Sequence, residues 1–127
     1  MPVRVLIVDD LEPFRIAARA VVDSTPGFQV VGEAASGEES VAAALALHPD
    51  LVLMDVNLPG MDGVEATRRI LARSHRTVVL LLSTRDAADV GPVVANAGAF
   101  AYLAKSSFSP ERLAEAWAAA DSANGDR

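Results

Sequence analysis

The sequence lacks cysteine altogether, which excludes disulfide bonds, thiol catalysis and thiolate metal sites. Long apolar runs are also missing, because stretches such as Val78 to Leu82 are far shorter than the roughly 18 or more residues of a membrane span. The opening "MPVRVLIVDD" contains no export signal, since two aspartates lie where a small-residue cleavage site would be. We therefore expect one domain located in the cytoplasm.

Positive charge is scarce. The chain has 11 lysines and arginines against 17 aspartates and glutamates, and its formal net charge is −6. Such a chain repels nucleic acid and anionic membrane surfaces. The main basic cluster lies late in a predicted helix and in the turn after it, where cations suit the helix dipole and solvent; it consists of Arg68, Arg69, Arg73 and Arg76. We expect this domain to contact neither nucleic acid nor membrane.

The chain does contain a regular alternation of short apolar runs and segments with helical spacing. The runs predict five strands, at residues 3–8, 28–31, 51–54, 78–82 and 99–103. Strands that are apolar on both faces and separated by helices indicate a parallel sheet covered on both sides. We predict an α/β fold with one five-stranded parallel sheet.

Helix starts are marked by capping residues. Ser36 and Glu39 have the spacing of a capping box before an alanine-rich helix. Other predicted start signals are Asp62, Ser109 followed by Pro110, and Pro13 in a first turn.

Polar side chains follow the predicted strands, and the carboxyl ends of strands are where open α/β sheets bind ligands. These residues are Asp9 and Asp10, Asp55, Ser83 and Thr84, and Lys105. Crowded carboxylates repel one another unless a cation intervenes, and oxygen ligands suit Mg²⁺. A carboxylate beside Mg²⁺ can attack phosphorus and become an aspartyl phosphate. Capping of the first helix is the alternative role for Asp9 and Asp10 taken alone.

Four segments together resemble the receiver domain of two-component response regulators. They are "VLIVDD", "PDLVLMDVNLPGMDG", "VVLLLST" and "GAFAYLAKS", and in this order they cover nearly the whole chain. The resemblance implies a flavodoxin-like strand order, 2-1-3-4-5, and a receiver domain over residues 1–121. Residues 122–127 are then expected to form a frayed tail or the start of a linker.

The resemblance also implies roles for individual residues. Asp55 matches the phosphoacceptor, which takes its phosphate from a sensor histidine kinase. Asp9, Asp10 and Asp55, with the backbone carbonyl of Asn57, match the ligands of Mg²⁺, for which Mn²⁺ is the alternative.

Further site residues are implied on the later strands. Ser83 matches the switch hydroxyl, and Lys105 matches the lysine that contacts the phosphate. Tyr102 matches the aromatic residue that changes rotamer when the hydroxyl moves. Asn57 and Thr84 border access to the phosphate, and we hypothesise that Thr84, larger than the usual Ala or Gly, narrows that access.

The expected function is that of a regulatory phosphoacceptor that promotes phosphoryl transfer to its own Asp55, rather than that of an enzyme acting on other substrates. Phosphorylation is expected to change partner contacts or a homodimer through the surface of the fourth and fifth helices. "DDLEPFR" and "AKSSF" further resemble the subfamily often joined to a helix-turn-helix DNA-binding domain, which implies a role in transcription.

Other functions remain as alternatives. One is an atypical receiver that binds partners constitutively without phosphorylation. Another is an aspartyl-phosphate phosphatase, which would need a second aspartate where Asn57 stands. A flavin-binding module would need a glycine- and hydroxyl-rich loop after the first strand, where "DDLEPF" is acidic.

Two positions depart from the receiver pattern. Ser106 stands where many receivers have proline after the lysine. Gly91 and Pro92 lie where the fourth helix should run, and proline inside a helix costs about 3 kcal/mol or more. We predict that this helix begins late, near Asp89 with Pro92 in its first turn, or is distorted.

Overall fold

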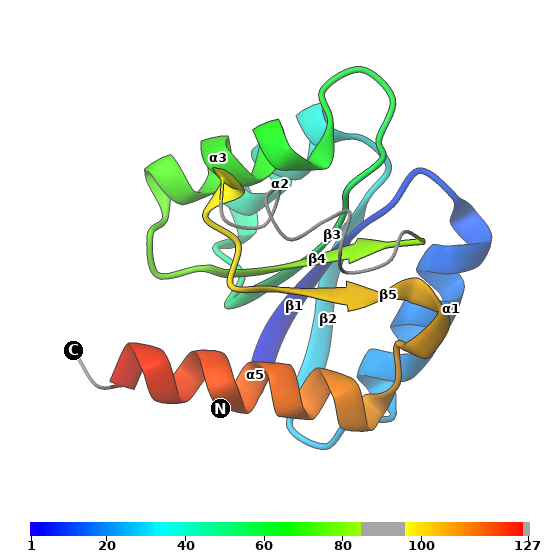
Figure 1. Ribbon diagram of the computed structural model, residues 1–127, viewed down its shortest axis with the longest axis vertical. Coiled ribbons are helices and arrows are strands. Elements are labelled where there is room, and N and C mark those ends of the chain that lie inside the picture. The colour runs from blue at the N-terminus through cyan, green and yellow to red at the C-terminus, as the bar shows by residue number, and fades with distance from the viewer. Residues whose placement is uncertain (85–95, 126–127) are drawn as a thin grey trace.

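The computed structural model describes residues 1–84 and 96–125 of the chain. Strands and helices alternate over residues 3–83, and the strands form the centre of the molecule (Figure 1). In chain order the elements are β1 (Val3–Val8), α1 (Glu12–Asp23), β2 (Phe28–Ala34), α2 (Gly37–Leu47), β3 (Leu51–Asp55), α3 (Gly63–Arg73), β4 (Val78–Ser83), β5 (Ala101–Ala104), a 3-10 turn (Lys105–Ser107) and α5 (Pro110–Gly125).

The strands of the described chain form one parallel sheet in the order β2-β1-β3-β4-β5, which confirms the predicted fold class and strand order. β1 lies between β2 and β3, so that Val8 is opposite Ala34 on one side and Met54 on the other. β3 in turn pairs with β4, and Asp55 is opposite Leu82. The ends of β1 and β3 that lead into acidic residues therefore lie side by side.

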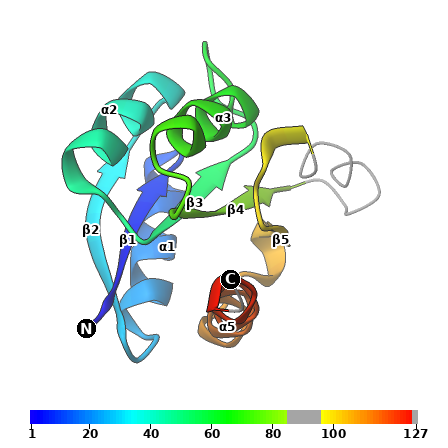
Figure 2. The ribbon, with the colours of Figure 1, turned by 90° about the vertical axis from the view of Figure 1, so that its left-hand side faces the viewer.

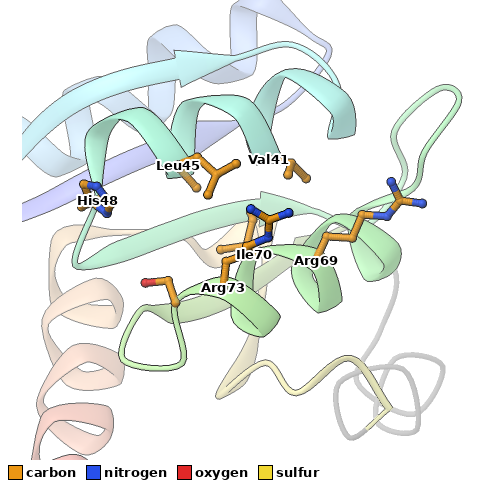
Figure 3. A pocket seen from close by; sticks show the side chains of 8 residues that line it. Val41, Leu45, His48, Arg69, Ile70 and Arg73 are labelled. Carbon is orange, nitrogen blue, oxygen red and sulfur yellow. The ribbon is translucent and has the colours of Figure 1, made fainter.

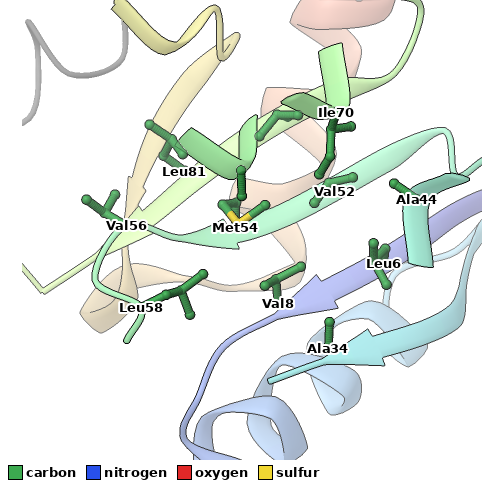
Figure 4. Packing of buried hydrophobic residues seen from close by; sticks show 12 residues of the cluster. Leu6, Val8, Ala34, Ala44, Val52, Met54, Val56, Leu58, Ile70 and Leu81 are labelled. Carbon is green, nitrogen blue, oxygen red and sulfur yellow. The ribbon is translucent and has the colours of Figure 1, made fainter. Parts of the chain in front are cut away.

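Helices cover both faces of this sheet. α2 and α3 lie on one face, and α1 and α5 lie on the other (Figure 2). Because side chains alternate along a strand, each face has its own apolar cluster. Under α2 and α3, Leu6, Val52 and Met54 pack with Ala44 and Ile70 (Figure 4). The opposite cluster includes Val5, Ile7, Leu53, Leu80, Ala18, Val22 and Leu113.

The predicted helix starts are confirmed. The side chains of three N-cap residues accept a hydrogen bond from the backbone N–H three residues later: Ser36 from Glu39 at 3.1 Å, Asp62 from Glu65 at 2.9 Å and Ser109 from Arg112 at 3.2 Å. Pro13 lies in the first turn of α1. These caps satisfy backbone donors that the first turn of a helix leaves free.

Several strand boundaries differ from the predicted ones because pairing, rather than composition, sets them. β2 continues to Ala34, since Gly32 and Glu33 still pair with β1. β5 starts at Ala101 rather than at residue 99, after a turn in which Gly98 has a φ of 83°. β3 and β4 each include the polar residue that follows the apolar run, Asp55 and Ser83 respectively.

The structure does not test two predictions, the start of the fourth helix and the end of the domain. The helix predicted to begin near Asp89, with Gly91 and Pro92, lies outside the described residues. α5 runs to Gly125, and the domain boundary expected at residue 121 stays a prediction. Of the helices described, none combines the length and apolar character needed to cross a membrane.

Candidate functional site

Three carboxylates gather at the carboxyl ends of β1 and β3. Asp55 is the last residue of β3, and Asp9 and Asp10 directly follow β1. One carboxylate oxygen of each lies within 4.8 Å of the other two. Asp9 and Asp55 are buried, with 0% and 3% of their surface exposed, whereas Asp10 is exposed. The strand order thus brings together the acids that the sequence placed at strand ends.

Backbone hydrogen bonds fix the position of Asp9. Its N–H donates to the carbonyl of Ala34 at 3.1 Å, and its Oδ1 accepts from the N–H of Leu11 at 2.9 Å. Its own carbonyl accepts a 2.7 Å hydrogen bond from the guanidinium of Arg15. Asp9 and Asp10 are not helix caps, because the N-cap of α1 is Leu11 and no described side chain caps that helix.

Lys105 supplies positive charge at the site. It is the first residue after β5, and its Nζ lies 2.6 Å from Oδ2 of Asp9 and 3.5 Å from Oδ1 of Asp55. Only 12% of its side chain is exposed, so solvent screens these ion pairs weakly. One ammonium therefore faces two buried carboxylates, which leaves an excess of negative charge.

This excess of negative charge acts on the pKa of Asp55. Burial raises the pKa of the Asp55 carboxyl above its ordinary value of 3.8, and the negative charge of Asp9 raises this pKa further. The ammonium of Lys105 and the hydrogen bond from the backbone N–H of Asn57 oppose both effects. Burial and the charge of Asp9 thus both disfavour a negative charge on Asp55.

The donor set fits a divalent cation. Among the described residues, Oδ2 of Asp9 is buried without a hydrogen-bond partner, because its contact with Lys105 is a charge pair outside hydrogen-bond geometry. Hard cations such as Mg²⁺ prefer oxygen ligands, and one or two carboxylates usually hold them. A cation beside Asp9, Asp10 and Asp55 would coordinate this oxygen, which has no hydrogen bond, and relieve the repulsion among the acids.

The other predicted site residues surround the same edge of the sheet. Asn57 lies in the exposed loop after β3, and its backbone N–H donates to Oδ1 of Asp55 at 3.2 Å. Ser83 is the buried last residue of β4, opposite Ala104 of β5, and Thr84 follows it on the surface.

Tyr102 lies farther back, on β5. It is opposite Leu81 of β4, and its half-buried side chain packs against the apolar cluster under α2 and α3. The structure therefore brings Asp9, Asp10, Asp55 and Lys105 together, with Tyr102 behind them in the sheet.

The loop after Asp55 ends at a glycine that lies close to the backbone of Asp55. Gly63 is the first residue of α3, and a Cβ added there would lie 2.0 Å from the backbone oxygen of Asp55. The N–H of Gly63 also donates to the carbonyl of Val56 at 3.1 Å. Only a residue without a side chain permits this approach. Gly63 is more than a turn residue, because it sets how closely α3 packs behind Asp55.

Two residues of α1 beside the site were missed by the sequence analysis. Arg15 contacts the backbone of Asp9, and its Nε lies 3.3 Å from Oε1 of Glu33 on β2. The Nζ of Lys105 lies 4.5 Å from the centre of the Phe14 ring, over its face. Both residues follow the acidic pair in "DDLEPFR", but helical spacing alone does not show that they face the strand ends.

Two surface hollows lie away from the carboxylates. Between α2 and α3, a hollow of about 30 Å³ is bordered by Leu45, Ile70 and Arg73 (Figure 3). A hollow of about 390 Å³ lies beside Val78 and Phe100. None of the described residues that line these hollows is acidic, and none belongs to the candidate site.

Comparisons with known proteins agree with this arrangement of residues. Residues 5–118 match the sequence model of the family described as the response regulator receiver domain. A crystal structure of a two-component response regulator of the LuxR family, from Aurantimonas sp. SI85-9A1, is similar with a TM-score of 0.84. The two are 33% identical, and the similarity covers 94% of this chain and 84% of the other.

Curated relatives are similar over most of the chain. It is 42% identical over 110 residues to the transcriptional regulatory protein LiaR of Bacillus subtilis (strain 168), covering 86% of this chain and 52% of LiaR. It is 44% identical over 104 residues to the response regulator GacA of Pseudomonas viridiflava, covering 81% of this chain and 48% of GacA. The chain thus spans about half the length of these relatives.

Proposed function

Because the chain belongs to the family of response regulator receiver domains, we propose that it is a signalling switch whose Asp55 accepts a phosphoryl group from a sensor histidine kinase. The observation that carries the proposal is the buried carboxylate of Asp55 at the end of β3, flanked by Asp9 and Lys105. A buried, negatively charged cluster with one ammonium suits phosphoryl transfer, which depends mainly on positioning and electrostatics.

In the proposed reaction, an ionised oxygen of Asp55 forms a bond to phosphorus. The phosphorus–nitrogen bond of the phosphohistidine breaks, and its electron pair stays with the imidazole. Lys105, 3.5 Å from Oδ1 of Asp55, offsets the negative charge that the phosphoryl group brings. The chain thereby promotes the phosphorylation of its own aspartate, and we propose no other catalytic activity for it.

We propose Mg²⁺ as the cofactor, with Mn²⁺ as the alternative. Asp9, Asp10 and Asp55 would hold the ion, together with the backbone carbonyl of Asn57. When bound, the ion supplies positive charge that neutralises the crowded carboxylates and the phosphoryl oxygens. The oxygen-only donor set and the buried Oδ2 of Asp9, which lacks a hydrogen bond, support this assignment.

The proposed switch lies on β4 and β5. Phosphorylation adds negative charge at Asp55, and we propose that this charge draws the Ser83 hydroxyl and Lys105 toward it. Tyr102, on the strand next to Ser83, would respond by changing rotamer. Thr84 lies exposed at the end of β4, a place from which its side chain would narrow access to the phosphate.

For the output we propose transcriptional regulation in the cytoplasm, since LiaR is named a transcriptional regulatory protein. Phosphorylation would change contacts with a partner, or with a second copy of the chain, through the surface of the fourth and fifth helices. A phosphatase function has less support, because Asn57 stands two residues after Asp55, where that chemistry needs an acid.

The intact mass of the protein after incubation with Mg²⁺ and acetyl phosphate tests the proposed reaction. We expect wild type to gain the mass of one phosphoryl group, because Asp55 is the buried nucleophile of the site. The gain should disappear in Asp55→Asn and when the divalent cation is chelated.

Asp23→Asn is the matched control, since Asp23 is an exposed carboxylate at the end of α1 and the substitution has the same charge change. It should be phosphorylated as wild type is. Absence of any mass gain in a wild-type protein that binds Mg²⁺ would contradict the proposal and favour a constitutive binding module.

A further inference from the structure

Lys105 has a third neighbour besides the two carboxylates. Its Nζ lies over the ring of Phe14, 4.5 Å from the ring centre. A cation within about 6 Å of an aromatic ring centre, over its face, is attracted by the negative charge density there. The ammonium is therefore enclosed by Asp9, Asp55 and an aromatic face of α1.

The ring of Phe14 is itself held in place. It is half-buried, and the centre of the Phe108 ring lies 6.5 Å away at an interplanar angle of 38°. Phe108 directly follows the turn that Lys105 begins, and its N–H donates to the carbonyl of Lys105 at 3.4 Å. The two rings thus connect α1 to the backbone that carries Lys105.

We propose that Phe14 is a positioning residue for Lys105, and that its ring face holds the ammonium beside Asp55 for phosphoryl transfer. This inference rests on the proposed function. The ammonium pairs more closely with Asp9, at 2.6 Å, than with Asp55, at 3.5 Å, so it must shift toward Asp55 when the phosphoryl group arrives. A ring face has no hydrogen-bond direction, so it stabilises the ammonium in both places and excludes water from it.

A series of ring substitutions separates this electrostatic role from packing. Fluorinated phenylalanines at position 14 keep nearly the same shape while the negative charge on the ring face declines. We expect the maximal rate of Asp55 phosphorylation by acetyl phosphate to fall stepwise along the series. In Phe14→Leu the rate should fall about fivefold, or about 1 kcal/mol in the barrier, with little change in the KM for the donor. Phe14→Trp should retain most of the rate, because indole also attracts cations.

A spectroscopic signature accompanies the rate. Protons on the Lys105 side chain near a ring face experience a ring current, so their NMR signals should lie upfield in wild type and return toward ordinary values in Phe14→Leu. A residue that only fills space would leave the rate insensitive to fluorination.

The matched control is Phe28→Leu. Phe28 belongs to the other end of the sheet, at the start of β2, where its ring packs edge-on against Trp117 at 6.3 Å. This change removes an aromatic pair without touching Lys105, so the rate of phosphorylation should remain that of wild type.

The outcomes distinguish the two proposals. Equal rates across the fluorinated series, in a protein that is phosphorylated, would overturn the role of Phe14 and leave the proposed function standing. Absence of phosphorylation in wild type would overturn both. If Phe14→Leu fails to fold, the fluorinated series, with its nearly unchanged shape, still decides the question.

Discussion

Burial makes the ionised form of the Asp55 carboxyl costly to the folded state. Burial and the neighbouring charge of Asp9 both disfavour its carboxylate, and Lys105 compensates only in part. A carboxyl whose pKa is raised by folding binds its proton more tightly in the native state than in the unfolded chain. The stability that it contributes is fully present below the unfolded pKa and is lost as the pH rises through the folded pKa.

We therefore expect the free energy of unfolding of wild type, measured relative to that of Asp55→Asn and without divalent cations, to fall as the pH rises from below the ordinary carboxyl range toward neutrality. Asp55→Asn lacks the contribution of this carboxyl and should be the more stable protein at neutral pH, because it removes the buried charge. Urea unfolding of both proteins across this pH range measures the difference.

Asp23→Asn again serves as control, since Asp23 is exposed and distant from the site. It should keep the slope of wild type. A wild-type slope in Asp55→Asn would show that the pH dependence comes from other groups.

At the scale of elements, the helix starts could be predicted from capping residues close together in the sequence. The strand ends could not, because they depend on pairing between segments far apart in the sequence. Ser36 and Asp62 were predictable because a cap depends on residues three positions apart. The extension of β2 through Gly32 was not, because it depends on pairing with β1. The close approach of α3 to Asp55 could not be predicted either, since Gly63 resembles any turn glycine in the sequence.

Gly63→Ala should destabilise the fold markedly. The added Cβ would lie 2.0 Å from the backbone oxygen of Asp55, and backbone atoms cannot move aside as a side chain can. We expect a loss of about 1–3 kcal/mol, the usual range for overpacking. Denaturant unfolding measures this loss, and slower phosphorylation of Asp55 should accompany it.

Gly32→Ala is the matched substitution, because its nearest neighbour, at 2.7 Å, is a methyl group at the end of the Leu47 side chain. That methyl group can turn away, so the loss should be smaller. A smaller loss in Gly63→Ala than in Gly32→Ala would contradict this account of the loop.

At the scale of the whole molecule, the strand order explains why so much of the candidate site was predictable. Parallel strands deliver their last residues to one edge, so a pattern of apolar runs ending in Asp9, Asp55 and Ser83 already implies convergence. The contacts of Phe14 and Arg15 were not predictable, because they depend on how α1 rotates against the sheet. Sequence patterns predict which edge of the sheet holds the site, whereas packing decides which helix residues reach that edge.

Binding of Mg²⁺ should stabilise the whole domain, because the ion binds carboxylates that only the folded chain brings together. At a Mg²⁺ concentration tenfold above the Kd, linkage predicts about 1.4 kcal/mol, seen as a rise of the Tm. Asp10→Asn should weaken this stabilisation by Mg²⁺, since it removes one of the three carboxylates of the cluster, the exposed one. A full response in Asp10→Asn would exclude Asp10 as a ligand, and Asp23→Asn should respond as wild type does.

The strands that carry the site differ in how many neighbouring strands they pair with. We therefore expect the aspartate side and the lysine side of the site to differ in local stability. β1 and β3 are paired on both sides, and their residues nearest the site are buried, so their amides should exchange with solvent only when most of the domain unfolds. β5 lies at the end of the described strand order and is half-buried along its length, so we expect it to open at lower free energy. We therefore expect the strand that leads into Lys105 to open while Asp9 and Asp55 stay folded, so that the lysine side is the adjustable part of the site.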